Sequence, residues 1–184
     1  MGPRERYREQ VRDEVKQHAW EQIATAGVPA LSLNAIAKQM GMSGPALYRY
    51  FANRDELITA LIRDAYQSLA DAVITKETDL LGLAETIREW ALADPHRYLL
   101  IYGTPVPGYH APADTTAISD QVMQVIVETA GDPATAVHRG LLFWTRLHGV
   151  LSLELAGHFT GMDVDPAALV AEEIKALRAG SHRS

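Results

Sequence analysis

The chain has 184 residues, a formal net charge of −6 and no cysteine, which excludes disulfides, thiolate nucleophiles and cysteine-based zinc sites. The N-terminal residues MGPRERYREQVRDE are charged and do not resemble a secretory signal. No apolar run approaches the roughly 20 residues of a membrane-spanning helix, so we expect a soluble, cytoplasmic protein without a membrane partner.

Helical patterns dominate the chain and strand alternation is absent, which predicts an all-α fold. The first helix is predicted over residues 3–26, because Gly27 is a typical residue just past a helix end. Its apolar side chains recur every four residues. They are Val11, Val15, Ala19 and Ile23.

Two short helices are predicted next, joined by a tight turn at Gly41. Ser32 is a suitable N-cap for the first and Ser43 for the second. Pro45 falls in the first turn of the second helix, where it removes no helix hydrogen bond. This pattern is typical of a helix-turn-helix, whose second helix enters the major groove of DNA.

A capping box of Asn53 and Glu56 begins a further helix, predicted to run to about residue 76. Asp-Pro pairs start three of the later helices, since Asp caps and Pro suits the first position. The remaining helices are predicted over residues 80–93, 95–102, 115–130, 132–159 and 166–179, with an irregular loop at 103–114.

Residues 11–57 resemble the DNA-binding domain of the TetR family of transcriptional regulators. The matching residues are Ala19, Gly27, Ser32, Ile36, Ala37, Gly41, Ser43, Ala46, Leu47, Tyr48, Tyr50, Phe51, Arg54, Glu56 and Leu57. Residues 144–149 also resemble a Trp-His-Gly signature found in one subgroup of the family's C-terminal domains. The resemblance implies a DNA-binding domain over 1–57 and an effector-binding and dimerisation domain over 58–184, connected by the helix that begins at residue 54.

The resemblance also implies which residues contact a double-stranded DNA operator. They are Ser32, Asn34, Ser43, Gly44, Pro45, Ala46, Tyr48, Arg49, Tyr50 and Arg54. Three of these have a second interpretation: Ser43 as a cap alone, Tyr48 as a packing aromatic, and Asn34 as a solvated amide.

The first turn of the second short helix, residues 44–46, offers no side-chain hydrogen bond. Bidentate base contacts are therefore expected to be few. We expect recognition to depend on Tyr48, Asn34, methyl contacts and DNA shape, with phosphate contacts fixing the register.

The charge distribution is compatible with DNA binding despite the negative total. Residues 1–63 carry nine basic and seven acidic side chains, whereas residues 64–184 carry eight basic and sixteen acidic ones. A mildly basic N-terminal head (residues 1–63) on an acidic body (residues 64–184) predicts modest non-specific affinity for DNA.

The last two predicted helices are the candidates for a homodimer interface. One continuous seam on the first follows a 4-3-4-3-4 spacing and consists of Val137, Leu141, Trp144, His148, Leu151 and Leu155. A second apolar face beside this seam indicates that the helix is covered on two sides. The predicted interface residues are Val137, Leu141, Trp144, Leu151, Leu155, Leu169, Val170, Ile174 and Leu177.

Aromatic residues of the body, together with one leucine, are candidates for a pocket that binds an apolar or amphipathic small-molecule effector. The candidates are Trp90, Tyr98, Tyr102, Phe143, Trp144, Leu147 and His148. The alternative is that these aromatics are ordinary core residues and that His148 is a hydrogen-bonded structural histidine.

The resemblance implies a repressor that binds a palindromic operator as a homodimer and is released by its effector. The alternative is a helical protein-interaction adaptor with weakened or lost DNA binding. We expect no catalytic site, cofactor or metal site, because the histidines lack helical ligand spacing and no nucleophile has a base nearby.

Overall fold

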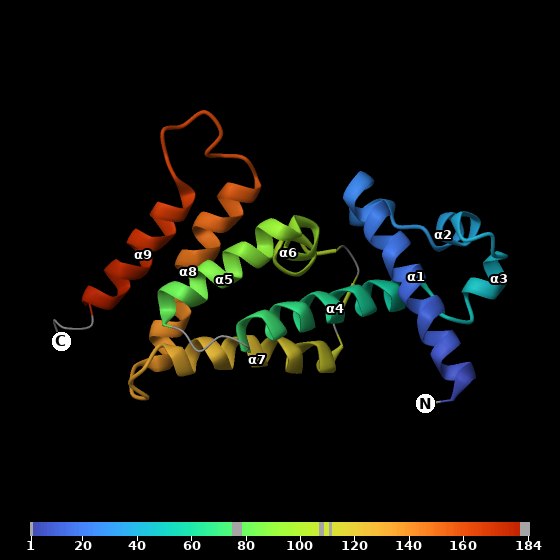
Figure 1. Cartoon of the computed structure of the whole chain (residues 1–184), viewed down its shortest axis with the longest axis horizontal. Helices are drawn as coiled ribbons and strands as arrows, with labels where there is room; N and C mark the ends of the chain where they lie inside the picture. The colour runs from blue at the N-terminus through green and yellow to red at the C-terminus, as the bar shows by residue number, and fades with distance from the viewer. Residues whose placement is uncertain (1, 75–78, 107–108, 111, 181–184) are drawn as a thin grey trace. The chain divides into compact units, whose positions relative to one another are not determined.

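A computed structural model describes residues 2–74, 79–106, 109–110 and 112–180. Its regular elements are helices, which confirms the predicted all-α class (Figure 1). They are α1 (Pro3–Ala26), η1 (Val28–Ala30), α2 (Leu33–Gln39), α3 (Gly44–Leu47), α4 (Arg54–Ile74), α5 (Leu80–Ala93), α6 (Pro95–Tyr102), α7 (Ala113–Thr129), α8 (Ala136–Leu155) and α9 (Pro166–Gly180). No helix in these ranges combines the length and apolar composition that a bilayer crossing requires.

The chain divides into two compact units. Unit 1 comprises Met1–Ala65 and His96–Thr115, and unit 2 comprises Tyr66–Pro95 and Thr116–Ser184. Helix α4 therefore contributes to both units, while α6 and the loop after it group with the N-terminal helices. The functional division into residues 1–57 and 58–184 stays a prediction.

Unit 1 is organised around the apolar face of α1. The predicted stripe is confirmed, since all four of its side chains are at most 5% exposed. Helix α1 packs against η1 and α2, and α2 packs against α3. The buried side chains that complete this core include Leu33, Ile36, Ala37, Leu47, Phe51, Leu57, Ile58 and Leu61.

In unit 2, α5, α8 and α9 pack against one another. Their shared core includes Ile87, Phe143, Leu147, Leu151 and Ile174, each at most 1% exposed. A half-buried ion pair joins two of these helices: Arg88 Nε on α5 donates to Glu154 Oε2 on α8 at 2.8 Å.

Helix α8 ends at Leu155, earlier than the predicted end at residue 159. Gly157 adopts a positive φ of 76°, and the N–H of His158 donates to the carbonyl of Leu153 at 3.0 Å. This bond, with a glycine in the left-handed region, terminates an α-helix. The predicted C-terminal end of α8 was therefore wrong.

The start of α8 also differs, because the helix begins at Ala136 and not at Asp132. The backbone N–H of Ala134 donates to the Asp132 carboxylate at 3.1 Å, and that of Thr135 donates to the Asp132 carbonyl at 3.0 Å. Asp132 thus anchors a turn that precedes the helix, which corrects the predicted start.

The ion pair between Arg88 and Glu154 yields a prediction about stability. The side chains of Arg88 and Glu154 are only 21% and 14% exposed. Glu154→Gln removes a charge from a half-buried bidentate pair, and we expect it to lower the free energy of unfolding by about 2 kcal/mol. Urea unfolding followed by circular dichroism measures this change.

The matched control is Glu173→Gln. Glu173 pairs with Arg146 at 3.6 Å in the same unit, and its side chain is 44% exposed. Exposed pairs contribute little, so this variant should change stability by less than about 0.5 kcal/mol. Equal effects of the two substitutions would contradict the structural role of the half-buried pair between Arg88 and Glu154.

Candidate nucleic-acid interface

The turn between α2 and α3 depends on Gly41, whose φ is +67°. The N–H of Met42 donates to the carbonyl of Ala37 at 2.8 Å, and the N–H of Gly41 donates to that of Lys38 at 3.2 Å. These two bonds close the end of α2 in the arrangement that a left-handed glycine permits. The chain can then reverse directly into α3.

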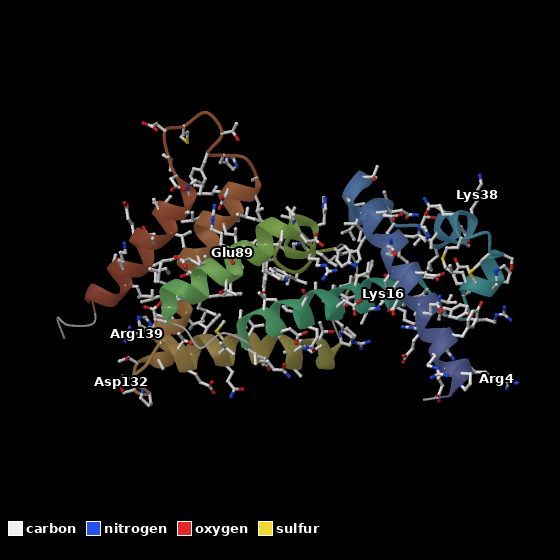
Figure 2. The ribbon with its side chains drawn as sticks, viewed as in Figure 1. Arg4, Lys16, Lys38, Glu89, Asp132 and Arg139 are labelled. Carbon is white, nitrogen blue, oxygen red and sulfur yellow. The ribbon has the colours of Figure 1, made fainter. Side chains whose placement is uncertain are left out.

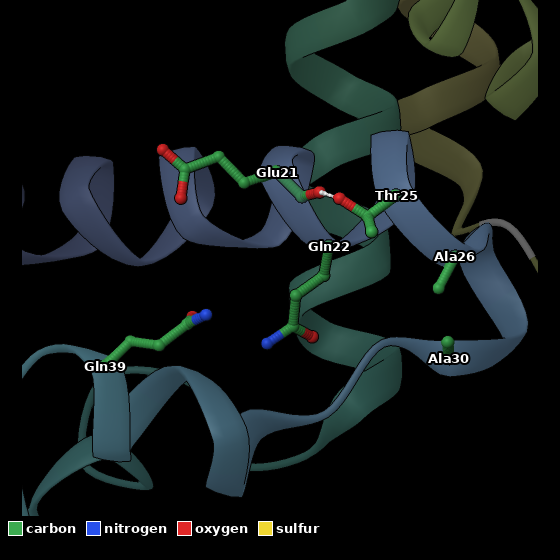
Figure 3. A pocket seen from close by; sticks show the side chains of 6 residues that line it. All are labelled: Glu21, Gln22, Thr25, Ala26, Ala30 and Gln39. Atoms are coloured by element: carbon green, nitrogen blue, oxygen red, sulfur yellow. Dashed lines mark hydrogen bonds between the residues drawn. The ribbon is translucent and has the colours of Figure 1, made fainter.

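The start of α2 is fixed by Ser32, the predicted N-cap. Its Oγ accepts a hydrogen bond from the N–H of Ala35 at 3.3 Å. Its own N–H donates to Gln22 Oε1 on α1 at 2.9 Å. Gln22 also lines a pocket of about 380 Å³ together with Gln39 of α2 (Figure 3). Helix α1 therefore positions α2 through a polar contact as well as through the core.

Asn34 and Gly44 lie side by side at the junction of the two short helices. A Cβ atom added to Gly44 would lie 3.3 Å from Asn34 Oδ1. Such a contact is tight, so a larger residue at position 44 would displace the exposed Asn34 side chain. Because Gly44 in the first turn of α3 has no side chain, it leaves room for the amide of Asn34 on α2.

The predicted contact residues on and after α3 differ in their exposure. Ser43 is the N-cap of α3 by its backbone, yet its side chain makes no capping hydrogen bond. Ser43, Pro45 and Arg49 are exposed, and Tyr48 is 43% exposed. Gly44, Ala46 and Tyr50 are half-buried. The exposed hydroxyl of Ser43 and the ring of Tyr48 are therefore accessible to a partner.

Two arginines of α1 hold the backbone that follows α3. Arg8 Nη2 donates to the carbonyl of Arg49 at 3.4 Å, and Arg12 Nη1 donates to that of Tyr50. The Arg12 guanidinium also lies 4.0 Å from the centroid of the Phe51 ring. The sequence interpretation missed this role of Arg8 and Arg12. Their four-residue spacing on one helix face was the available signal.

Arg54, predicted to contact the DNA operator, contacts backbone carbonyls within unit 1. Its Nη2 donates to the carbonyl of Val28 at 2.7 Å, and its Nε donates to that of Leu31 at 3.3 Å. One guanidinium thus joins the start of α4 to the segment that leads into α2. An operator contact of Arg54 stays a prediction.

Lys16 shows why the number of basic residues in the head overstates the positive charge that can attract DNA. It lies on α1 (Figure 2), with its Nζ 2.7 Å from Asp64 and 3.0 Å from Asp13. Burial lowers the pKa of Lys16, but hydrogen bonds and charge attraction from both aspartates outweigh it and raise the pKa overall. Lys16 is therefore neutralised by its own chain. Lys38 on α2 is exposed (Figure 2).

The candidate effector residues are divided between the two units. In unit 1, Tyr98 and Tyr102 of α6 have ring centroids 5.4 Å apart. Tyr98 is 1% exposed, and burial raises the pKa of its hydroxyl to about 12. Trp90 belongs to unit 2, where its indole N–H donates to Ser68 Oγ at 3.1 Å.

The other candidate effector residues lie on α8 in unit 2. Phe143 and Leu147 are at most 1% exposed, so they belong to the core of this unit. Trp144 and His148 are half-buried and pack edge to face, with ring centroids 3.9 Å apart. An effector pocket built from these residues and the tyrosines of α6 stays a prediction.

The candidate dimer residues also fall into two groups. Leu151, Val170, Ile174 and Leu177 are at most 6% exposed and pack inside unit 2. Val137 and Leu141 are 61% and 48% exposed, although both are large and apolar. Trp144, Leu155 and Leu169 are half-buried. The accessible part of the predicted seam is therefore the N-terminal half of α8.

Two family models match the chain. The model described as bacterial regulatory proteins of the tetR family matches residues 17–61. The model described as the tetracyclin repressor-like C-terminal domain matches residues 80–177, more than half of the chain. The chain belongs to the TetR family. This is a family of transcriptional regulators and not of enzymes.

Individual relatives agree with this membership. The HTH-type transcriptional regulator Rv1816 of Mycobacterium tuberculosis (strain ATCC 25618 / H37Rv) is 42% identical over 126 residues. The match covers 64% of this chain and 54% of Rv1816, so the chain matches about half the length of that curated relative. The crystal structure of SCO4313, described as a candidate regulatory protein, is 58% identical with a TM-score of 0.91. That match covers 97% of this chain and 100% of SCO4313.

A more distant TetR structure has the same fold. A TetR variant from Acinetobacter baumannii AYE, solved in complex with minocycline, has a TM-score of 0.61 at 18% identity. The match covers 92% of this chain and 94% of that protein. At this identity the similarity concerns the fold.

His148 gives a prediction about pH. Burial lowers the pKa of His148 to about 4, below the ordinary 6.5. The unfolded chain binds this proton at higher pH than the folded one, so the contribution of His148 to stability is complete above pH 6.5. It decreases by up to about 3 kcal/mol as the pH falls towards 4. Urea unfolding between pH 4 and pH 7 measures this dependence.

The control for this prediction is His148→Gln, which has no group that titrates in this range. The variant should show a flatter dependence of stability on pH than the original chain. Parallel pH profiles for the two proteins would show that His148 is not buried as a neutral group.

Proposed function

We propose that this chain is a transcriptional repressor that binds a palindromic DNA operator as a homodimer and is released by a small-molecule effector. The observation that carries the proposal is the α2–α3 surface of unit 1. Side chains able to contact DNA are exposed there, among them Asn34, Ser43, Tyr48 and Arg49. A helix-turn-helix with this exposure suits insertion into a major groove.

Base recognition by this surface is expected to use few direct hydrogen bonds. Asn34 is the side chain suited to a bidentate contact with adenine, and it lies beside the small Gly44. The Tyr48 ring can contact a thymine methyl group or the sugar-phosphate backbone. DNA shape and phosphate contacts would supply the remaining specificity and affinity.

Dimerisation is supported by the exposed apolar side chains of α8. A single head reads too few base pairs for specificity, whereas a two-fold dimer places two heads on half-sites about 34–36 Å apart. Val137 and Leu141 lie one helical turn apart and would otherwise remain in water. A two-fold axis near this end of α8 would cover both side chains with their copies from the second chain.

Effector release follows from thermodynamic linkage. A ligand that binds more tightly to a conformation unsuited to the operator lowers DNA affinity by the ratio of its two affinities. The minocycline complex of the distant Acinetobacter protein supports the proposal that a protein of this fold can bind a small molecule. At 18% identity, the chemistry of minocycline does not indicate which ligand this chain binds.

The first test of this function measures operator binding. Fluorescence anisotropy with the DNA upstream of the chain's own gene should show binding that weakens steeply with salt, with a slope of about −0.9 per phosphate contact. Tyr48→Ala should weaken binding about tenfold, by removal of an exposed aromatic contact. Its effect on stability should stay below about 0.5 kcal/mol because the ring is largely exposed.

Two outcomes would contradict the DNA-binding proposal. One is the absence of binding to genomic fragments at any salt concentration, which would favour the helical adaptor. The other is salt-insensitive binding that Tyr48→Ala leaves unchanged. Tyr48→Phe serves as the matched variant, since it retains the ring and removes only the hydroxyl.

The second test concerns the dimer. Leu141→Glu places a charge on the exposed seam and should convert a dimer into a monomer, as measured by analytical ultracentrifugation. Operator affinity should then fall by about 100-fold or more, because each head must bind alone. Leu153→Glu is the control: Leu153 is similarly exposed, 44% against 48%, but lies on another face of α8. Equal effects of both substitutions would refute this interface.

A further inference from the structure

Unit 1 contains an apolar cavity of about 780 Å³. It is lined by η1, by the first residue of α4, and by α6 with the loop that follows. Its apolar wall includes Val28, Leu31, Leu99, Pro105 and Val106. The volume falls within the range of about 300–1,000 Å³ that is usual for small-molecule sites.

The described lining combines an apolar wall with a positive charge. Leu99 contributes a side chain that is 45% exposed, although leucine is usually covered. Arg54 is the charged residue of the described lining. An apolar wall beside a guanidinium fits a ligand that has a hydrocarbon body and an anionic group.

The Arg54 guanidinium is held in a fixed position. Two of its N–H groups donate to the carbonyls of Val28 and Leu31, at 2.7 and 3.3 Å. Arginine has five N–H donors in a planar arrangement that matches a carboxylate. Among the described residues, no further acceptor is bonded to Arg54, so the remaining donors can serve a ligand.

We propose that this cavity binds a small apolar carboxylate and that its occupancy weakens operator binding. The second part rests on the proposed function. Arg54 fixes the carbonyl of Leu31, and the next residue, Ser32, caps α2. A carboxylate on Arg54 therefore acts on the segment that positions α2, and it neutralises a cation of the DNA-binding head. By linkage, DNA must weaken carboxylate binding by the same factor.

The binding test uses octanoate as the probe and methyl NMR of the full chain as the measurement. Octanoate at millimolar concentration should shift the methyl signals of Val28, Leu31, Leu99 and Val106. Octan-1-ol, which has the same chain but no charge, should bind about tenfold more weakly. Shifts confined to unit 2, equal binding of the alcohol, or no shifts would each overturn the site.

A substitution in the wall tests the location without altering Arg54. Leu99→Glu adds a carboxylate to the lining that contains Arg54 and should lower octanoate affinity about tenfold or more. Leu153→Glu, at 44% exposure on α8, should leave octanoate binding unchanged. Thermal unfolding checks that both variants are folded. Undiminished binding to folded Leu99→Glu would refute the assignment.

The link to DNA is measured separately. Octanoate should weaken binding to the chain's own promoter DNA, and Leu99→Glu should remove this sensitivity. Octanoate binding in the cavity with unchanged operator affinity would refute the coupling. Failure to bind the promoter without octanoate would instead refute the proposed function, and the NMR result would still decide whether the site exists.

Discussion

Arginine side chains that hold backbone carbonyl groups are the interaction on which the DNA-binding head depends. Helices α2 and α3 have only seven and four residues. Isolated helices shorter than about 12 residues are marginal in water, so both need support from the rest of the unit. The apolar face of α1 supplies packing, whereas the hydrogen bonds of Arg8, Arg12 and Arg54 fix the direction of the connecting segments.

This support limits how freely the basic side chains of the head can reach DNA. Arginines engaged with carbonyls keep their charge but lose freedom to follow a phosphate, and Lys16 is paired with two aspartates. The basic residues of the N-terminal third therefore stabilise the fold, and their net charge is not a direct measure of the attraction to DNA. In the proposed homodimer, such a head would gain affinity chiefly from being present twice.

Local patterns in the sequence predicted the helices well. The bounds of α1, α5 and α6 agree with those predicted, because caps, glycines and prolines act within a few residues. Contacts between distant segments were not predictable in this way. No local pattern shows that Arg54 reaches Val28 or that α6 groups with the head. An apolar stripe likewise cannot distinguish Ile174, covered by its own unit, from the exposed Val137.

The proximity of Gly44 to Asn34 has a consequence for how this surface could change its preferred DNA sequence. A side chain added at position 44 would gain a contact of its own and at the same time move the amide of Asn34. In the proposed contact with DNA, the two positions would act together, and their substitutions should be non-additive. A new operator preference would be reached most readily by changing both residues together. Relatives of this domain with different operators should therefore differ at positions 34 and 44 together.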